Sequence, residues 1–388
     1  MVSLTQQSRK TRVAYVSSYP PRECGIATFT RNLVVTMDQH RLLAPGVVVA
    51  VNEKGAAYNY GRQVKVQIER DSIDSYRDAA SWINRSKVDL VNLQHEFGLF
   101  GGSWGEHVLT FLEELQRPVV TTLHTVLLTP PPKVKETVEQ IARHSSAIVN
   151  IGLNATRILK ENYSITNKVV HIPHGSPDIP FIRNDKLKAS LGLNGKTVLS
   201  TFGLMSRNKG IHHMIRALPS IIKQDPNIIY LVLGETHPEV RKVEGEQYRN
   251  RLMKLVDNLG IVKYVRFHNR FLTQRELIRY LQATDIYLAP YVSRDQVSSG
   301  TLVYALVAGK AIVSTPFLHA QELLADGRGL FCKFRNPASI AKSTITLLEN
   351  KELTQEMKKK AYDYGRQFVW SNVAEKYIKL FRKLIKTS

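Results

Sequence analysis

The sequence predicts an α/β protein with two doubly wound domains, each built on a parallel sheet. The chain has 388 residues, too many for one ordinary hydrophobic core. Short apolar stretches alternate with longer amphipathic ones, which indicates βαβ units. The alternation stops at residues 177–185, a proline-containing segment that fits neither period, and then restarts. We therefore expect an N-terminal domain over residues 1–180, a C-terminal domain over 181–370 and a final helix over 371–388.

The elements of the N-terminal half are placed by their apolar periodicity. Strands are expected at residues 12–18, 88–94, 119–124, 147–151 and 169–173. Helices are expected at residues 26–37, 104–115 and 134–143.

The C-terminal half repeats this pattern. Strands are expected at residues 197–202, 228–233, 265–268, 286–289 and 311–314, with a helix at 211–223. Residues 371–386 form a strong helix candidate with one apolar face and one basic face. Such a helix can lie on anionic lipid, but we favour the alternative, in which the apolar face belongs to the core.

The chain is strongly basic, with a formal net charge of +21. Nucleic acid, anionic membrane and anionic small molecules are the general candidates for a partner. The cations are scattered, and no RNA-binding signature, zinc spacing or basic-zipper pattern accompanies them, so no nucleic-acid partner is expected. Peripheral association with an anionic membrane remains a hypothesis, and the oligomeric state is left open.

Cysteine usage and the N-terminus indicate a cellular location. Only Cys24 and Cys332 are present, which make neither a disulfide framework nor a four-ligand metal site. Residues 1–12 lack the apolar core of a signal peptide, and no apolar run approaches the length of a membrane span. The expectation is a cytoplasmic protein.

Ligands of doubly wound sheets bind beyond the carboxyl ends of the strands, so two facing domains would form the site in a central cleft. Gly25 lies where the first strand turns into a helix, and the free N–H groups there suit phosphate or sugar oxygens. The loop from Gly203 to Gly210 sets Arg207 and Lys209 between two glycines, as a pyrophosphate would require. For the first loop the alternative is a purely structural turn, and for the second it is a surface loop whose cations are only solvated.

Three histidines, His95, His124 and His174, fall at the ends of strands of one predicted sheet. Histidine can bind sugar hydroxyls or move protons. The three do not share the short spacing of a helical zinc site, so no catalytic metal is expected. Amides at the start of the helix that follows residues 295–299 would also donate to a ligand, and the Glu322 carboxylate could accept ribose or sugar hydroxyls.

Together these segments resemble the family 4 retaining glycosyltransferases, which have the GT-B architecture of two Rossmann-like domains. The resemblance runs from about residue 12 to 383 and rests on the order of several motifs. Residues 202–210 resemble the donor-phosphate loop of the family, and residues 169–175 its hinge segment. Residues 283–290, 300–315 and the surroundings of Glu322 resemble further motifs of the donor-binding domain, and residues 368–381 its closing helix.

The resemblance implies roles for individual residues. His124 should contact the transferred sugar near the reaction centre and is the predicted catalytic residue. The predicted donor-binding residues are Gly25, Gly203, Arg207, Lys209, Gly234, Arg270, Ser299, Gly300, Thr301, Leu302 and Glu322. The predicted acceptor-binding residues are Arg22, His95, Glu96 and His174.

The implied reaction transfers a sugar from a nucleotide-sugar donor to a saccharide or lipid-linked acceptor. Cationic and N–H donors, with no metal and no other cofactor, would assist departure of the nucleotide. The donor is a GDP- or UDP-sugar, with GDP-mannose favoured. The closing helix over 371–388 should cross back onto the N-terminal domain.

Two departures from the family pattern keep alternatives open. Gln296 and Tyr304 stand where the family usually has two glutamates, so the retaining or inverting outcome is not fixed. Leu204 replaces the arginine that normally follows the loop glycine. A sugar phosphorylase of the same fold and a non-catalytic scaffold subunit are the competing interpretations, and the enzyme is favoured.

Overall fold

The computed structural model of the chain describes residues 9–182 and 185–387. The chain divides into two units. Unit 1 holds the residues up to Gly175 together with those from Trp370 onward, and unit 2 holds Ser176–Val369. The last helix therefore belongs to the N-terminal unit.

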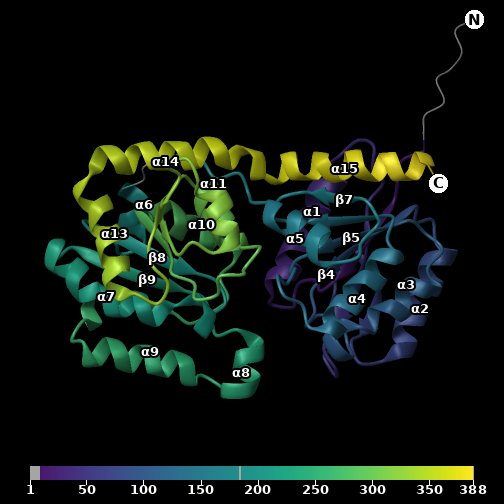
Figure 1. Cartoon of the computed structure of the whole chain (residues 1–388), viewed down its shortest axis with the longest axis horizontal. Helices are drawn as coiled ribbons and strands as arrows, with labels where there is room; N and C mark the ends of the chain where they lie inside the picture. Colours follow the sequence, from purple (N-terminus) through teal and green to yellow (C-terminus); the bar gives the residue numbers. More distant parts are fainter. Residues whose placement is uncertain (1–8, 183–184, 388) are drawn as a thin grey trace, which may run out of the picture. The chain divides into compact units, whose positions relative to one another are not determined.

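Unit 1 is built on a seven-stranded, wholly parallel sheet with the order β3-β2-β1-β4-β5-β6-β7. Figure 1 labels β4, β5 and β7 of this sheet. Its strands are β1 (Val13–Ser17), β2 (Val47–Asn52), β3 (Val64–Glu69), β4 (Leu90–His95), β5 (Val119–Leu123), β6 (Ala147–Asn150) and β7 (Val169–His171). Its helices are α1 (Gly25–Asp38), α2 (Ile73–Arg85), the 3-10 turn η1 (Ser103–Gly105), α3 (Val108–Glu114), α4 (Pro132–Arg143), α5 (Leu153–Asn162) and α15 (Trp370–Thr387).

Two apolar layers cover the two faces of this sheet. Successive side chains of β1 alternate between them: Val13 and Tyr15 pack with α1 and α15, whereas Ala14 and Val16 pack with α2 and α3. A strand covered on both faces needs a continuous apolar run, which is what β1 and β2 have.

Helix α15 supplies part of the unit 1 core. Val373, Tyr377 and Phe381 are completely buried, and the helix packs against α1. The Tyr377 hydroxyl forms a 3.0 Å hydrogen bond with the Thr122 hydroxyl of β5. The apolar face of this basic helix is thus a core face, as favoured from the sequence.

Unit 2 is built on a six-stranded parallel sheet with the order β10-β9-β8-β11-β12-β13. Its strands are β8 (Thr197–Phe202), β9 (Ile228–Leu233), β10 (Val265–His268), β11 (Ile286–Ala289), β12 (Ala311–Ser314) and β13 (Leu330–Phe331). Its helices are α6 (Asp185–Ser190), the 3-10 turn η2 (Arg207–Lys209), α7 (Ile211–Gln224), α8 (Pro238–Glu244), α9 (Gln247–Asn258), η3 (Val262–Tyr264), α10 (Gln274–Ala283), α11 (Gly300–Val307), α12 (Leu318–Leu323), α13 (Pro337–Glu349), α14 (Lys351–Gly365) and η4 (Arg366–Phe368).

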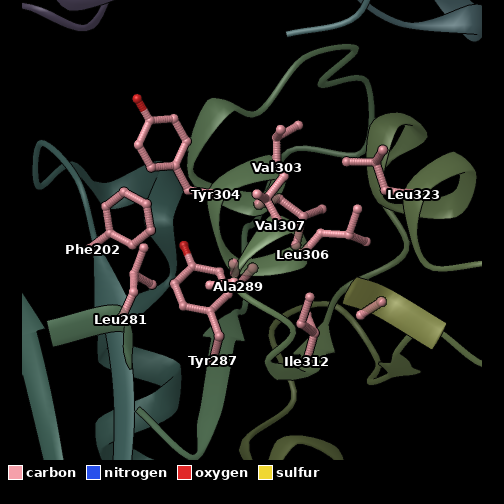
Figure 2. Close-up of a cluster of buried hydrophobic side chains, with 14 of the residues drawn as sticks. Phe202, Leu281, Tyr287, Ala289, Val303, Tyr304, Leu306, Val307, Ile312 and Leu323 are labelled. Atoms are coloured by element: carbon pink, nitrogen blue, oxygen red, sulfur yellow. The ribbon is translucent and has the colours of Figure 1, made fainter. Parts of the chain in front are cut away.

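One core layer of unit 2 joins β8 and β11 to helix α11. Figure 2 shows Phe202 and Tyr287 from the strands beside Val303 and Leu306 from the helix. Helix α11 is apolar almost all round, so this layer fixes its position and that of its first turn.

The helix expected over residues 104–115 is the clearest error of the sequence analysis. It is divided, because Trp104 and Gly105 adopt left-handed φ values of 56° and 81°. The α-helix proper begins only at Val108. Such φ values cannot continue a right-handed helix.

We predict that Phe381→Ala in α15 destabilises unit 1 by about 3–5 kcal/mol, because the mutation removes a fully buried ring. All three tryptophans, at positions 82, 104 and 370, lie in unit 1, so denaturant unfolding followed by tryptophan fluorescence reports on this unit. Lys379→Ala, at an exposed position of the same helix, is the control and should change little. If both variants unfold at the same midpoint denaturant concentration, α15 does not stabilise unit 1.

Candidate functional site

In each sheet the strand order reverses at one point, between β1 and β4 in unit 1 and between β8 and β11 in unit 2. The connections that leave these strands run in opposite directions, which opens a crevice at the carboxyl ends. The residues predicted from the sequence fall mostly in the loops at these two points.

Helix α1 opens directly after the loop that follows β1. Cys24 caps it, with its Sγ accepting a hydrogen bond from the Ala27 N–H (3.2 Å) and lying 3.1 Å from the Ser18 hydroxyl. A Cβ on Gly25 would meet no atom within 4 Å, and its φ is not left-handed. Packing therefore does not require glycine here, and the first turn of α1 is left open to a ligand.

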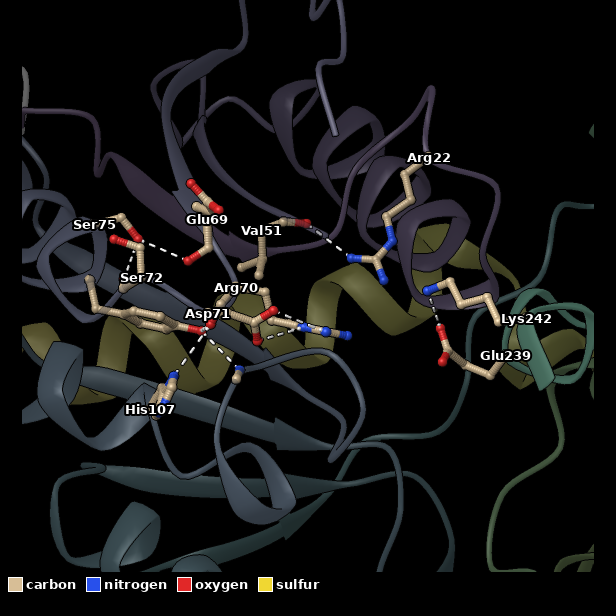
Figure 3. Close-up of polar contacts among 12 residues, drawn as sticks. Arg22, Val51, Glu69, Arg70, Asp71, Ser72, Ser75, His107, Glu239 and Lys242 are labelled. Carbon is tan, nitrogen blue, oxygen red and sulfur yellow. Dashed lines mark hydrogen bonds and ion pairs between the residues drawn. The ribbon is translucent and has the colours of Figure 1, made fainter. Parts of the chain in front are cut away.

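Arg22, a predicted acceptor-binding residue, is engaged within its own unit. Its guanidinium forms a 2.8 Å ion pair with Glu53 and donates to the Val51 carbonyl at 3.1 Å. Figure 3 shows the contact with Val51, which ties the loop after β1 to the end of β2. The structure thus gives Arg22 an anchoring role that the sequence analysis did not foresee.

The three histidines gather around Phe29 of α1 and the loop after β4. His124 and His174 each set their rings edge-on to Phe29, with centroids 4.8 and 5.0 Å apart. His95 packs instead between Phe97 and Phe100, at 5.3 and 5.8 Å. Because His95 has no exposed surface, its ring does not reach a ligand directly in this conformation.

Burial keeps these imidazoles neutral. Desolvation lowers the pKa of His95 to about 4, and desolvation together with the neighbouring His174 and His95 lowers that of His124 to about 3. The pKa of His174 falls to about 4 for the same main reason. None of the three is an imidazolium at neutral pH, so none can act there as a cationic acid.

Hydrogen bonds set the tautomers of two of these rings. The Nε2 of His124 lies 2.8 Å from the Gln94 side-chain oxygen, which can only accept, so Nε2 carries the proton. The Nδ1 of His174 lies 2.7 Å from the Gly175 carbonyl, so the proton is on Nδ1 there. Each ring therefore has its second nitrogen in the form that accepts a hydrogen bond.

Glu96 adds a half-buried carboxylate beside the histidines. It accepts hydrogen bonds from the Thr125 hydroxyl (2.7 Å) and from the Phe97 N–H (3.1 Å). Burial raises its pKa, against the effect of these two donors. Thr125 directly follows His124, so Glu96 is held close to the predicted catalytic residue.

In unit 2, two glycines let the ends of β8 and β9 touch. Gly203 and Gly234 have φ values of 115° and 136°, and a Cβ on Gly234 would lie 2.3 Å from the Gly203 carbonyl oxygen. Neither position accepts a side chain. Both positions, which are predicted to bind the donor, therefore require glycine for the contact between the two strand ends.

Lys209 is directed toward the start of α11. Its Nζ donates to the Tyr291 hydroxyl at 2.9 Å and lies 4.2 Å from the centre of that ring. The Tyr291 hydroxyl is 2.5 Å from the Thr301 hydroxyl, which is 3.2 Å from that of Ser299. Burial raises the pKa of Tyr291, but the Lys209 charge and these hydrogen bonds outweigh it, so the pKa is lowered.

Ser299 caps α11 through its hydroxyl, which accepts from the Leu302 N–H, and its own N–H donates to the His319 ring. The predicted group Ser299, Gly300, Thr301 and Leu302 is thereby one helix start beside Lys209. Tyr291 and His319 were not singled out in the sequence analysis. The only sequence signal for them is their position just after β11 and in the segment after β12.

Two predicted donor-binding arginines pair with carboxylates outside the Lys209 cluster. Arg207 forms a 2.6 Å ion pair with Glu244 and lies over the Tyr248 ring. Arg270 is exposed and pairs with Glu276 at the start of α10. Glu322 is half-buried on α12.

The structure also shows the side-chain surroundings of the two positions where the family pattern has glutamates. Gln296 donates through its side chain to the Ser298 carbonyl at 2.8 Å. Tyr304 is almost buried in the core layer beside Phe202, and Figure 2 shows its hydroxyl directed away from that layer.

The residues described by the structure contain no group of three or more His, Cys, Asp or Glu side chains suited to a metal ion. Over the same residues, no helix is both long and apolar enough to cross a membrane.

Comparison with known proteins supports a transferase relationship. Residues 183–364 match the family of glycosyl transferases group 1. An uncharacterized glycosyltransferase of Methanocaldococcus jannaschii is 25% identical over 252 residues, which are 63% of this chain and 60% of that protein. The phosphatidyl-myo-inositol mannosyltransferase of Mycolicibacterium smegmatis is 23% identical over 314 residues, 79% of this chain and 74% of that enzyme. The match thus spans less than two thirds of the archaeal relative.

The fold is shared with solved structures. The Anabaena protein HepE, solved in complex with UDP and glucose, superposes with a TM-score of 0.76 at 15% sequence identity, over 96% of this chain and all of that one. The two parallel-sheet, Rossmann-like units thus have the GT-B fold expected from the sequence.

We predict that the stability of unit 1 falls as the pH drops from 6.5 toward 4. The unfolded chain binds a proton at His95 near pH 6.5, whereas the folded chain does so only near pH 4. This residue alone should cost about 2 kcal/mol at pH 5 and nothing above pH 7. His95→Phe should remove that part of the pH dependence, measured by denaturant unfolding with tryptophan fluorescence.

The control is His144→Asn, at an exposed position of the same unit, which should keep the full pH dependence. If the stability of His95→Phe depends on pH as steeply as that of the unchanged protein, another group is responsible for the pH dependence.

Proposed function

We propose, from the match of residues 183–364 to the family of glycosyl transferases group 1, that this chain is a glycosyltransferase. It would transfer a sugar from a nucleotide-sugar donor to a carbohydrate or glycolipid acceptor. The donor diphosphate would bind in unit 2, and the sugar and acceptor would be recognised by the histidine loops of unit 1.

The observation on which this proposal mainly rests is the Lys209 cluster. A buried tyrosine and a threonine hold the ammonium at the N-terminal end of α11, at the point where the strand order of unit 2 reverses. A fixed cation beside free helix N–H groups is suited to the charge that develops on a departing diphosphate. No metal is needed for this step in our proposal, and no other cofactor takes part.

His124 would act as a neutral hydrogen-bonding group. Its tautomer is set by Gln94, so Nδ1 can accept a hydrogen bond from a sugar hydroxyl. His174 and Glu96 would bind the acceptor, and the open first turn of α1 at Gly25 would admit substrate oxygens close to the backbone. A charged imidazolium would oppose an oxocarbenium-like sugar, so the depressed pKa of His124 favours this role.

We propose GDP-mannose as the donor and a lipid-linked acceptor. Support comes from the mycobacterial relative, a phosphatidyl-myo-inositol mannosyltransferase. The Anabaena protein of the same fold was solved with UDP and glucose, so UDP-glucose is the donor to test against.

Lys209→Ala should weaken nucleotide-sugar binding about 10- to 100-fold, because it removes a charge-assisted contact worth roughly 1.5–3 kcal/mol. Binding is measured by calorimetry with GDP-mannose and UDP-glucose, each with magnesium and with chelator. Lys223→Ala, at the other end of α7 and exposed, is the matched control. Unchanged affinity in Lys209→Ala would remove the lysine from the donor site, and absence of binding by either nucleotide would favour a scaffold subunit.

His124→Ala should lower kcat about 10- to 100-fold while the donor Kd stays within about twofold, because the ring contacts the sugar and not the diphosphate. Protection of β5 amides from hydrogen exchange verifies that unit 1 is still folded. The exposed His144→Ala variant should turn over normally. A normal rate in a folded His124→Ala protein would contradict the assignment.

A further inference from the structure

Unit 2 contains a cavity that the proposed donor site does not use. It has a volume of about 640 Å³ and lies between helices α7 and α9, with Arg207, Val292 and Arg335 contributed by neighbouring loops. We call it the α7–α9 pocket. Its other lining residues are His212, His213, Arg216, Tyr248, Arg251, Leu252, Lys254, Leu255 and Asn258.

The arginine and lysine side chains that line the pocket are all cationic. Arg207, Arg216, Arg251, Lys254 and Arg335 line it, and no lining residue is a carboxylate. Arg207 is neutralised by Glu244, whereas the structure gives the other four side chains no hydrogen bond or ion pair with any described residue. Four cations around one cavity repel one another unless an anion binds between them.

The floor of the pocket is buried and partly aromatic. Tyr248 and Leu252 are buried, and the Tyr248 hydroxyl forms a 3.0 Å hydrogen bond with Nδ1 of His212. Burial, and after it the neighbouring His213 and the arginines around the pocket, lower the pKa of His212 to about 4. Arg335 has a left-handed φ of 54°, a conformation that residues other than glycine rarely adopt.

The pocket is separate from the Lys209 cluster. The short turn η2 sends Arg207 to Glu244 and Tyr248, and Lys209 to Tyr291. Neither Tyr291 nor Thr301 lines the α7–α9 pocket. A ligand here would therefore not compete for the contacts that we assign to the donor diphosphate.

We propose that the α7–α9 pocket binds a small ligand that carries two or more clustered phosphate groups. One guanidinium group can donate two parallel hydrogen bonds to the oxygens of one phosphate. Several cationic side chains around one cavity match the charge density of such a ligand. The volume is in the range of small-molecule sites, and the buried floor makes the pocket concave, unlike the extended basic stripe that binds nucleic acid. The ligand is either a soluble polyphosphorylated compound or the headgroup of a phosphorylated lipid.

Calorimetry with inorganic tripolyphosphate at constant ionic strength tests the soluble source. The Lys209→Ala protein is the background, so that binding at the donor site is already weakened. Arg216→Ala/Arg251→Ala should weaken tripolyphosphate binding at least tenfold. Lys223→Ala/Arg275→Ala removes the same charge from exposed positions of α7 and α10 outside the pocket and should change it less than twofold.

Sedimentation with phosphatidylcholine vesicles, with and without phosphatidylinositol bisphosphate, tests the lipid source with the same variants. If Arg216→Ala/Arg251→Ala weakens binding of one probe while the control pair does not, the proposed site is supported. The probe whose binding is weakened then identifies the ligand as soluble or lipid-borne. Equal loss in the control pair, or no saturable binding of either probe, overturns the proposal. GDP-mannose binding by the Arg216/Arg251 variant with Lys209 intact should be unchanged, so failure here is separable from failure of the donor site.

Discussion

The reversal of strand order in each sheet is the constraint on which the candidate site depends. All strands in a unit are parallel, so their carboxyl ends meet at one edge, and the loops there diverge only where β1 neighbours β4 and β8 neighbours β11. Gly25 and His95 lie at the first of these points, with His124 and His174 packed nearby against Phe29, and Lys209 and the start of α11 lie at the second. Residues more than 80 positions apart, such as Lys209 and Tyr291, are brought into contact by this topology alone.

The two places where the strand order reverses differ in their electrostatics. In unit 1, desolvation keeps three imidazoles neutral, and the half-buried Glu96 carboxylate accepts hydrogen bonds from two donors. In unit 2, the Lys209 ammonium donates a hydrogen bond to a buried tyrosine whose pKa it lowers. A neutral, hydrogen-bonding environment suits sugar hydroxyls, whereas a fixed cation suits phosphate. This division of chemistry is what a transfer from a nucleotide-sugar requires, which is why the two halves support one proposal.

Much of the fold could be predicted because the central strands are continuous apolar runs. Five strands of unit 2, from β8 to β12, have the bounds expected from the sequence. Strands β2 and β3 are both absent from the sequence prediction. Strand β3 is an edge strand whose residues are mostly half-buried or exposed, whereas β2 is fully buried and was missed in spite of its apolar run. The division of residues 104–115 was also missed, since left-handed φ values at Trp104 and Gly105 leave little trace in apolar periodicity.

The directions of side chains were less predictable from the sequence than the positions of the loops that carry them. Arg207 and Lys209 are two residues apart in one glycine-bounded loop and were assigned to the same ligand. A 3-10 turn separates them, and a carboxylate on α8 and a tyrosine on α9 fix Arg207 elsewhere. These partners lie 37 and 41 positions along the chain, so local sequence carries no information about them. Arg22 is likewise paired with Glu53, a partner beyond the end of β2 that the local sequence does not reveal.

The absence of the glutamate pair is consistent with this arrangement. Tyr304 packs into the core layer of α11, and Gln296 bonds to the backbone of the preceding loop, so the helix start is built without carboxylates. The groups that remain next to the donor loop are an ammonium, hydroxyls and free N–H groups, which all favour negative charge. A carboxylate at either position would add repulsion to a bound diphosphate and would need a compensating cation. The family pattern has an arginine at the position of Leu204 and glutamates at those of Gln296 and Tyr304, so relative to that pattern the chain lacks one positive and two negative charges.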